Sequence, residues 1–102
     1  MTINQRLDSI IEIFGCTTLK WVMSLDTTHK IKAEISRELR DLLDAFICER
    51  ENNFILVTRA KILFSKVENI GPSAREFADH LYWFISLLEL DNTDEEGLRH
   101  AA

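Results

Sequence analysis

The residue types most suited to chemistry gather around His80, which follows Glu76 by four positions and Asp79 by one. Residues four apart share one face of a helix, so Glu76 and His80 could grip a metal ion, or the carboxylate could orient the imidazole. A metal site needs further ligands from other elements, and the sequence does not point to them. The Glu-x-x-His spacing of di-iron bundles is absent. We therefore interpret His80 as an ordinary polar residue at the edge of a helix face.

Two acidic pairs share an i,i+3 spacing, Glu38 with Asp41 and Glu76 with Asp79. All-helical nucleotide pyrophosphohydrolases bind magnesium through clustered carboxylates of this kind, because Mg²⁺ prefers oxygen ligands that it shares with substrate phosphates. Those enzymes also need a Glu-x-x-Glu pair on a partner helix, and this sequence has none. Two such pairs are expected by chance in an acidic protein, so we interpret both as solvated helix faces.

His29 could be a phosphoacceptor, as in the small, acidic histidine-phosphotransfer bundles. That role needs an exposed histidine in the middle of a helix, with small neighbours that admit the partner. His29 instead lies at a predicted helix end and lacks such neighbours. The sequence also has no glycine-rich phosphate loop and no nucleophile elbow. We therefore predict a protein that is not an enzyme and that uses no cofactor and no metal.

Residues 18–40 have the outline of a helix-turn-helix, with a turn at residues 26–28. Basic side chains of the following helix could meet phosphates: His29, Lys30, Lys32, Arg37 and Arg40. Acidic residues are interleaved with them, the turn lacks the characteristic glycine, and the net charge of the chain is −5. A DNA-binding transcriptional regulator is therefore the alternative function, and a nucleic-acid partner is not favoured.

The chain length and the amino-acid composition indicate one soluble domain. A chain of 102 residues is enough for one core, and 46% of the residues are hydrophobic and 28% are charged. The two cysteines, Cys16 and Cys48, are too few for a disulfide framework, and we expect partly buried free thiols in a reducing compartment. The N-terminal segment is amphipathic rather than a signal peptide, and no apolar run is long enough to span a bilayer. These features predict a cytoplasmic protein without membrane contact.

Apolar residues recur at helical spacing along most of the chain. Capping boxes, Thr2 with Gln5 and Ser73 with Glu76, indicate where the first and last helices begin, and Gly15 suits a helix end. The run from Phe54 to Val57 could be a short strand, but no second strand is available, so we favour a helix. The predicted helices span residues 2–15, 18–25, 28–50, 54–69 and 73–90.

These elements predict an all-α fold, a four- to five-helix antiparallel bundle-like single domain over residues 1–90. Leu39, Leu43 and Phe46 share one stripe of the long helix, and we expect them to face the core. Residues 91–102 are acidic and polar, and we predict a disordered C-terminal tail there.

The last predicted helix is apolar on two sides. One stripe, which includes Phe77, Leu81 and Phe84, is enough to attach the helix to its own bundle. A second stripe lies roughly 120° or more away on the helix, and it consists of Trp83, Leu87 and Leu90. A helix of this kind is either central in its bundle or pressed against another chain.

We predict that the second stripe is an interface with another protein chain, most simply a second copy in a homodimer. The rival explanation is that Leu19, Trp21 and Met23 fold over the stripe within one chain. The weak enzymatic signals and the surplus of apolar residues together favour a non-enzymatic protein–protein interaction module. Such a module would be a small regulator that binds or sequesters a partner, in the manner of an immunity protein, antitoxin, anti-activator or secretion chaperone.

Overall fold

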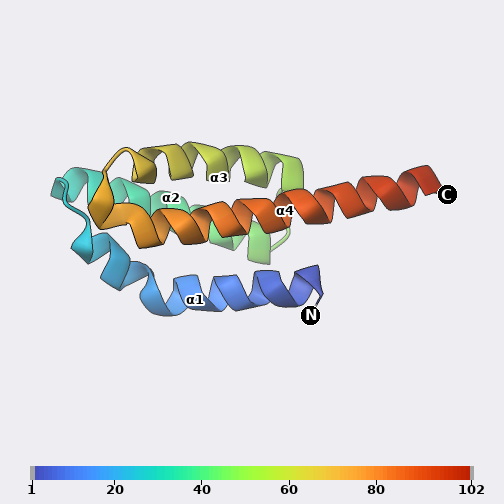
Figure 1. Ribbon diagram of the computed structural model, residues 1–102, viewed down its shortest axis with the longest axis horizontal. Coiled ribbons are helices and arrows are strands. Elements are labelled where there is room, and N and C mark those ends of the chain that lie inside the picture. Colours follow the sequence, from blue (N-terminus) through green and yellow to red (C-terminus); the bar gives the residue numbers. More distant parts are fainter. Residues whose placement is uncertain (1, 102) are drawn as a thin grey trace.

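The chain is an antiparallel helical bundle in a computed structural model, which describes the backbone of residues 2–101 and the side chains of residues 2–90. Helix α4 lies between α1 and α3 in the front layer, and α2 lies behind (Figure 1). No strand occurs in the described part, so the all-α prediction is confirmed, and the run from Phe54 to Val57 is helical. The elements are α1 (Ile3–Ser24), α2 (His29–Ile47), α3 (Asn53–Glu68), a 3-10 turn η1 (Pro72–Ala74) and α4 (Arg75–Ala101). The side chains of the predicted C-terminal tail lie outside the described residues.

Side-chain caps explain where the first three helices begin. The Thr2 hydroxyl accepts from the Gln5 backbone N–H at 3.2 Å, and Gln5 Oε1 accepts from the Thr2 N–H at 2.9 Å, which confirms the predicted capping box. The Thr28 hydroxyl caps α2 by accepting a 3.3 Å bond from the Ile31 N–H, and the Asn52 side chain caps α3 by accepting a 3.0 Å bond from the Ile55 N–H. Each cap satisfies a backbone donor that would otherwise lack a helical partner, which is worth about 1 kcal/mol.

The prediction that Gly15 ends the first helix is wrong, because α1 continues through it to Ser24. Helix α1 bends near Gly15 instead of ending there, and Figure 1 shows the change of direction before its last turns. The hydroxyls of Thr17 and Thr18 donate to the backbone carbonyls of Ile13 and Phe14, four residues earlier. Such back-bonding, beside a glycine, is a known cause of helix bending. Residues 18–25 are therefore the end of α1 and not a second helix.

The predicted Ser73–Glu76 capping box is also wrong, since the 3-10 turn η1 precedes α4. The Ser73 hydroxyl instead accepts a 2.9 Å hydrogen bond from the Asp26 backbone N–H, which ties the α1–α2 loop to the start of α4. Gly71 has φ 106, a conformation that a side chain would strain, and Pro72 supplies the first residue of the turn. The chain thus reverses at residues 71–72 as the sequence indicates, by a different local mechanism.

One aromatic cluster lies at the centre of the core. Phe84 is fully buried and meets Phe14 and Phe46 edge-on, with ring centroids 6.0 and 5.7 Å apart. Leu39 is buried as predicted, whereas Leu43 and Phe46 are only partly buried. Helix α4 supplies the largest group of buried side chains, which fits its place between α1 and α3.

Glu49 follows the end of α2 with φ 54, a left-handed conformation that favours glycine. The Glu49 N–H donates to the Phe46 carbonyl, and the Arg50 N–H donates to the Ala45 carbonyl, so the helix end needs this conformation. We expect Glu49→Gly to raise the free energy of unfolding by about 0.5–1 kcal/mol in urea titrations. Glu49→Ala is the matched control, because it removes the carboxylate but keeps the Cβ. An equal gain in both variants would mean that charge, not conformation, is responsible.

Candidate interaction surface

Helix α4 places the three predicted interface residues in two different environments. Trp83 and Leu90 are 60% and 52% exposed, although both are large and apolar. Leu87 is only 6% exposed and belongs to the core of its own chain. The structure therefore leaves Trp83 and Leu90 available to another chain and removes Leu87 from that surface, because Leu87 turns toward the bundle side of the stripe.

The end of α1 covers the beginning of α4. This agrees in part with the alternative that Leu19, Trp21 and Met23 fold over the second stripe of α4 within one chain. Trp21 is buried, stacks on Phe77 with ring centroids 5.5 Å apart, and lies 4.8 Å from the ring of His80. Leu19 and Met23, which the rival explanation also uses, remain exposed. Trp21 thus covers the first turns of α4 and leaves the turns that carry Trp83 and Leu90 uncovered.

His80 links the buried tryptophan to the exposed one. The His80 ring contacts both Trp21 and Trp83, and its centroid is 6.4 Å from that of Trp83. His80 Nδ1 is 2.8 Å from the Glu76 backbone oxygen. This hydrogen bond fixes the imidazole against the backbone of its own helix. His80 therefore supports the orientation of Trp83 by packing, which the sequence pattern did not reveal.

A third apolar residue borders the same surface. The ring contacts of Phe14 with Phe84 and of Trp21 with Phe77 show that α1 and α4 run antiparallel. Ile13 and Trp83 each precede one of the paired phenylalanines by one residue, so helical geometry places them on the same side of the α1–α4 contact. Ile13 is itself exposed. We call the surface formed by Ile13, Trp83 and Leu90 the α1–α4 face.

The other residues considered for chemistry are the acidic helix positions and His29. The Glu38 carboxylate accepts a 2.6 Å hydrogen bond from Lys66 Nζ, and this bond raises the pKa of Lys66 above its usual value. Its small stabilising effect would be lost only as the pH rises through that raised pKa, well above neutrality, and both side chains are solvent-exposed enough to screen it. His29 is exposed at the first position of α2. Over the described residues, no three His, Cys, Asp or Glu side chains are grouped so that they could hold a metal.

Both cysteines are exposed free thiols, not partly buried ones. Cys16 follows Gly15 at the bend of α1, and Cys48 Sγ donates to Asp44 Oδ1 at 3.7 Å just after α2. Their positions do not bring them into one site.

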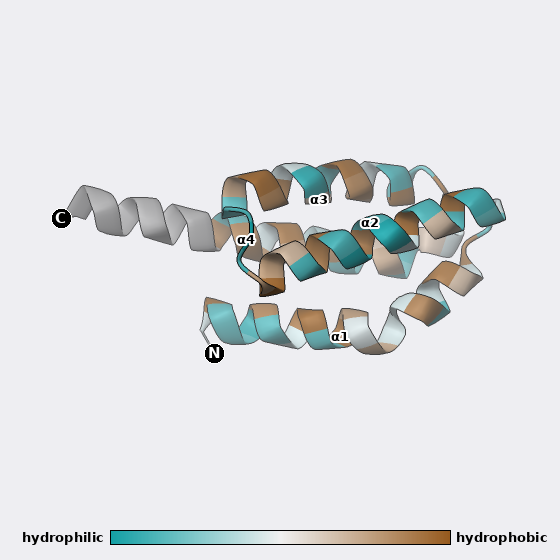
Figure 2. Cartoon of the chain, turned by 180° about the vertical axis from the view of Figure 1, so that it is seen from behind, coloured by the Kyte–Doolittle hydropathy of each residue, from teal (hydrophilic) through white to brown (hydrophobic). Residues whose placement is uncertain are grey.

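The first helix of the predicted helix-turn-helix outline is not a separate element, because residues 18–24 are the last turns of α1. Lys32, one of the basic residues invoked for phosphates, donates from Nζ to the Met23 backbone oxygen at 3.1 Å. That bond ties the start of α2 to the end of α1. The outer face of α2 is otherwise hydrophilic (Figure 2), with charges of both signs.

Comparison with known proteins finds no matching family model, no matching curated protein and no matching solved structure. Within the described part of the chain, no helix has both the length and the apolar character needed to cross a membrane.

Proposed function

We propose that this protein is a non-enzymatic protein–protein interaction module, a small regulatory protein that binds or sequesters a partner protein and forms a homodimer. The observation that carries the proposal is the exposure of Trp83 and Leu90 on a helix whose inner stripe already fills the core. Tryptophan is a frequent anchor of interfaces, because it buries a large area with few rotatable bonds. An immunity protein, antitoxin, anti-activator or secretion chaperone would all present such a surface.

The α1–α4 face suits a two-fold symmetric contact. Trp83 and Leu90 lie seven residues apart on one side of α4, about 10 Å along the axis. In an antiparallel pair of α4 helices, Trp83 of one copy would pack beside Leu90 of the other, with Ser86 near the symmetry axis. Ser86 is small, and its hydroxyl already donates to the Tyr82 carbonyl at 3.0 Å. The two helices could therefore approach closely at that point without leaving this hydroxyl unpaired.

Sedimentation equilibrium at micromolar concentrations tests the homodimer. We expect the wild-type chain to dimerise and the double variant Trp83→Glu, Leu90→Glu to be monomeric with an unchanged helical circular dichroism spectrum, because two buried charges per copy would oppose association. Leu19→Glu is the matched control, since Leu19 is 75% exposed but lies outside the α1–α4 face, and it should leave the dimer intact. A wild-type monomer under these conditions, or equal dissociation of the control, would contradict the proposal.

A further inference from the structure

A groove runs between α1 and α2 on a different side of the bundle from the α1–α4 face. One part, of 480 Å³, has Phe14, Leu39 and Leu43 among its lining residues. The other part, of 640 Å³, lies toward the start of α1, and Ile47 lines both parts. Leu19 and Ile47 are large apolar residues that line the groove and remain exposed. The 480 Å³ part of the groove is thus mainly apolar and open to another molecule.

Gly15 lines the apolar part of this groove and lies inside α1. A glycine within a helix lowers stability by about 0.5–1 kcal/mol relative to alanine. A Cβ added at Gly15 would meet no heavy atom of the chain within 4 Å, so no internal contact requires a glycine here. The missing side chain instead deepens the groove where a backbone from another molecule could approach closely.

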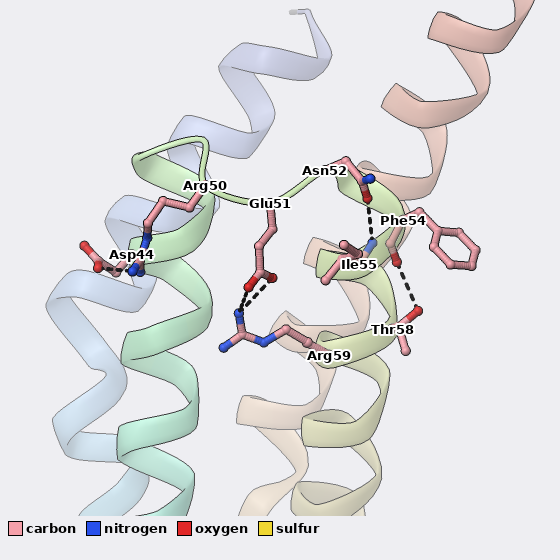
Figure 3. A network of polar contacts seen from close by, with 8 residues as sticks. All are labelled: Asp44, Arg50, Glu51, Asn52, Phe54, Ile55, Thr58 and Arg59. Carbon is pink, nitrogen blue, oxygen red and sulfur yellow. Dashed lines mark hydrogen bonds and ion pairs between the residues drawn. The ribbon is translucent and has the colours of Figure 1, made fainter.

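The end of the groove near the start of α1 is acidic. Asp8, Glu49 and Glu51 line it, and no basic residue does. Glu51 accepts two 2.9 Å hydrogen bonds from Arg59, as Figure 3 shows, whereas Asp8 and Glu49 form no ion pair within the described residues. The apolar part contains Arg40 together with Asp44, and Asp44 is paired with Arg50 at 2.7 Å. Among the described residues, two carboxylates without a paired cation therefore remain at the acidic end, those of Asp8 and Glu49.

We infer that the α1–α2 groove binds an amphipathic α-helix of a partner protein, with the apolar stripe of that helix over Gly15 and with lysine or arginine residues at the Asp8–Glu49 end. This inference rests on the proposed interaction function and names the partner's chemistry. The helix-in-groove mode needs apolar anchors spaced three and four residues apart, which the exposed Leu19 and Ile47 and the floor of the groove would receive. From Asn4 to Leu19 the groove extends about 22 Å, which is about four turns of a bound helix.

Charge favours a basic partner helix over a second copy of this chain. The exposed apolar stripe that a second copy could insert is that of Trp83 and Leu90. Glu76 and Asp79 lie on the same exposed side of α4, so an inserted α4 helix would carry negative charges into a groove whose one end is already acidic. A helix with basic residues at one end would replace that repulsion by attraction, and would bind less tightly at high salt.

A displayed library of amphipathic helices, selected on the full chain, tests the inference. The library keeps a leucine stripe over about four turns and randomises the flanking positions between lysine, glutamate, serine and alanine. We expect the selected peptides to carry lysine, not glutamate, at one end. Fluorescence anisotropy should then show at least about tenfold weaker binding to Gly15→Trp, which fills the groove, and to Asp8→Lys with Glu49→Lys. Gly15→Ala is the matched control and should bind nearly as well as the wild-type chain.

Three results would overturn the inference: no enriched peptide, enriched peptides without a charge bias, or unchanged binding to Gly15→Trp. Because a Cβ added at Gly15 would meet no heavy atom of the described residues within 4 Å, we expect Gly15→Trp to fold, and its thermal unfolding serves as the check. The dimer of the proposed function is measured separately, with Trp83→Glu and Leu90→Glu. A wild-type chain that is monomeric but binds the selected peptides would reject only the α1–α4 face, and a wild-type dimer that binds no peptide would reject only the groove.

Discussion

Replacing Phe84 with alanine should lower the free energy of unfolding by about 3–5 kcal/mol. Phe84 is fully buried on α4, and its ring meets those of Phe14 and Phe46 edge-on, so truncation removes contacts to α1 and α2 at once. The cost combines lost burial, a residual cavity and two aromatic pairs. A domain of this size is stable by only about 5–15 kcal/mol, so the variant would lose a large part of its total stability.

Phe54→Ala is the matched control for Phe84→Ala, since the same side chain is removed from a position on α3 that is 70% exposed. Figure 3 shows the Phe54 ring directed away from the neighbouring Ile55 and Arg59. We expect a change within about 0.5 kcal/mol for the control in urea titrations. Similar losses in both variants would mean that Phe84 is not the centre of the core, and a large loss in the control alone would place Phe54 in a contact with another chain.

Periodic patterns predicted the fold class because each helix must bury one face. The stripe through Leu39 was read correctly, and the capping box at Thr2 was placed to the residue. Predictions of helix ends and caps were less accurate where one residue type is compatible with more than one local structure. Gly15 with two threonines can end a helix or bend it, and only the packing of Trp21 on α4 requires the helix to continue. Ser73 has a hydroxyl that can cap its own helix or accept from a distant loop, and it accepts from Asp26.

The sequence also predicts the two candidate interaction surfaces only in part. Two apolar stripes on the last helix were evident from spacing, but spacing alone could not show that Leu87 turns inward while Trp83 and Leu90 stay exposed. That distinction depends on where α1 lies beside α4. No spacing pattern in the sequence predicts the α1–α2 groove, because it is formed by residues from two helices and by the absence of a side chain at Gly15. The glycine inside α1 is the one residue type that points to the groove, and glycine is equally typical of a helix end.

Replacing Trp21 with alanine should cost about 3–5 kcal/mol and should loosen the last turns of α1 specifically. Trp21 lies beyond the bend, and its ring contacts Phe14, Phe77 and His80, so it is the main aromatic link between this part of α1 and α4. Urea titration gives the global loss, and hydrogen exchange should show faster exchange after the bend than before it. The matched control is Trp83→Ala at a concentration where both variants are monomeric. Because Trp83 is 60% exposed, its removal should cost the monomer less than about 1 kcal/mol. If instead Trp83→Ala were the more destabilising change in the monomer, Trp83 would be a core residue, and the α1–α4 face would lose its anchor.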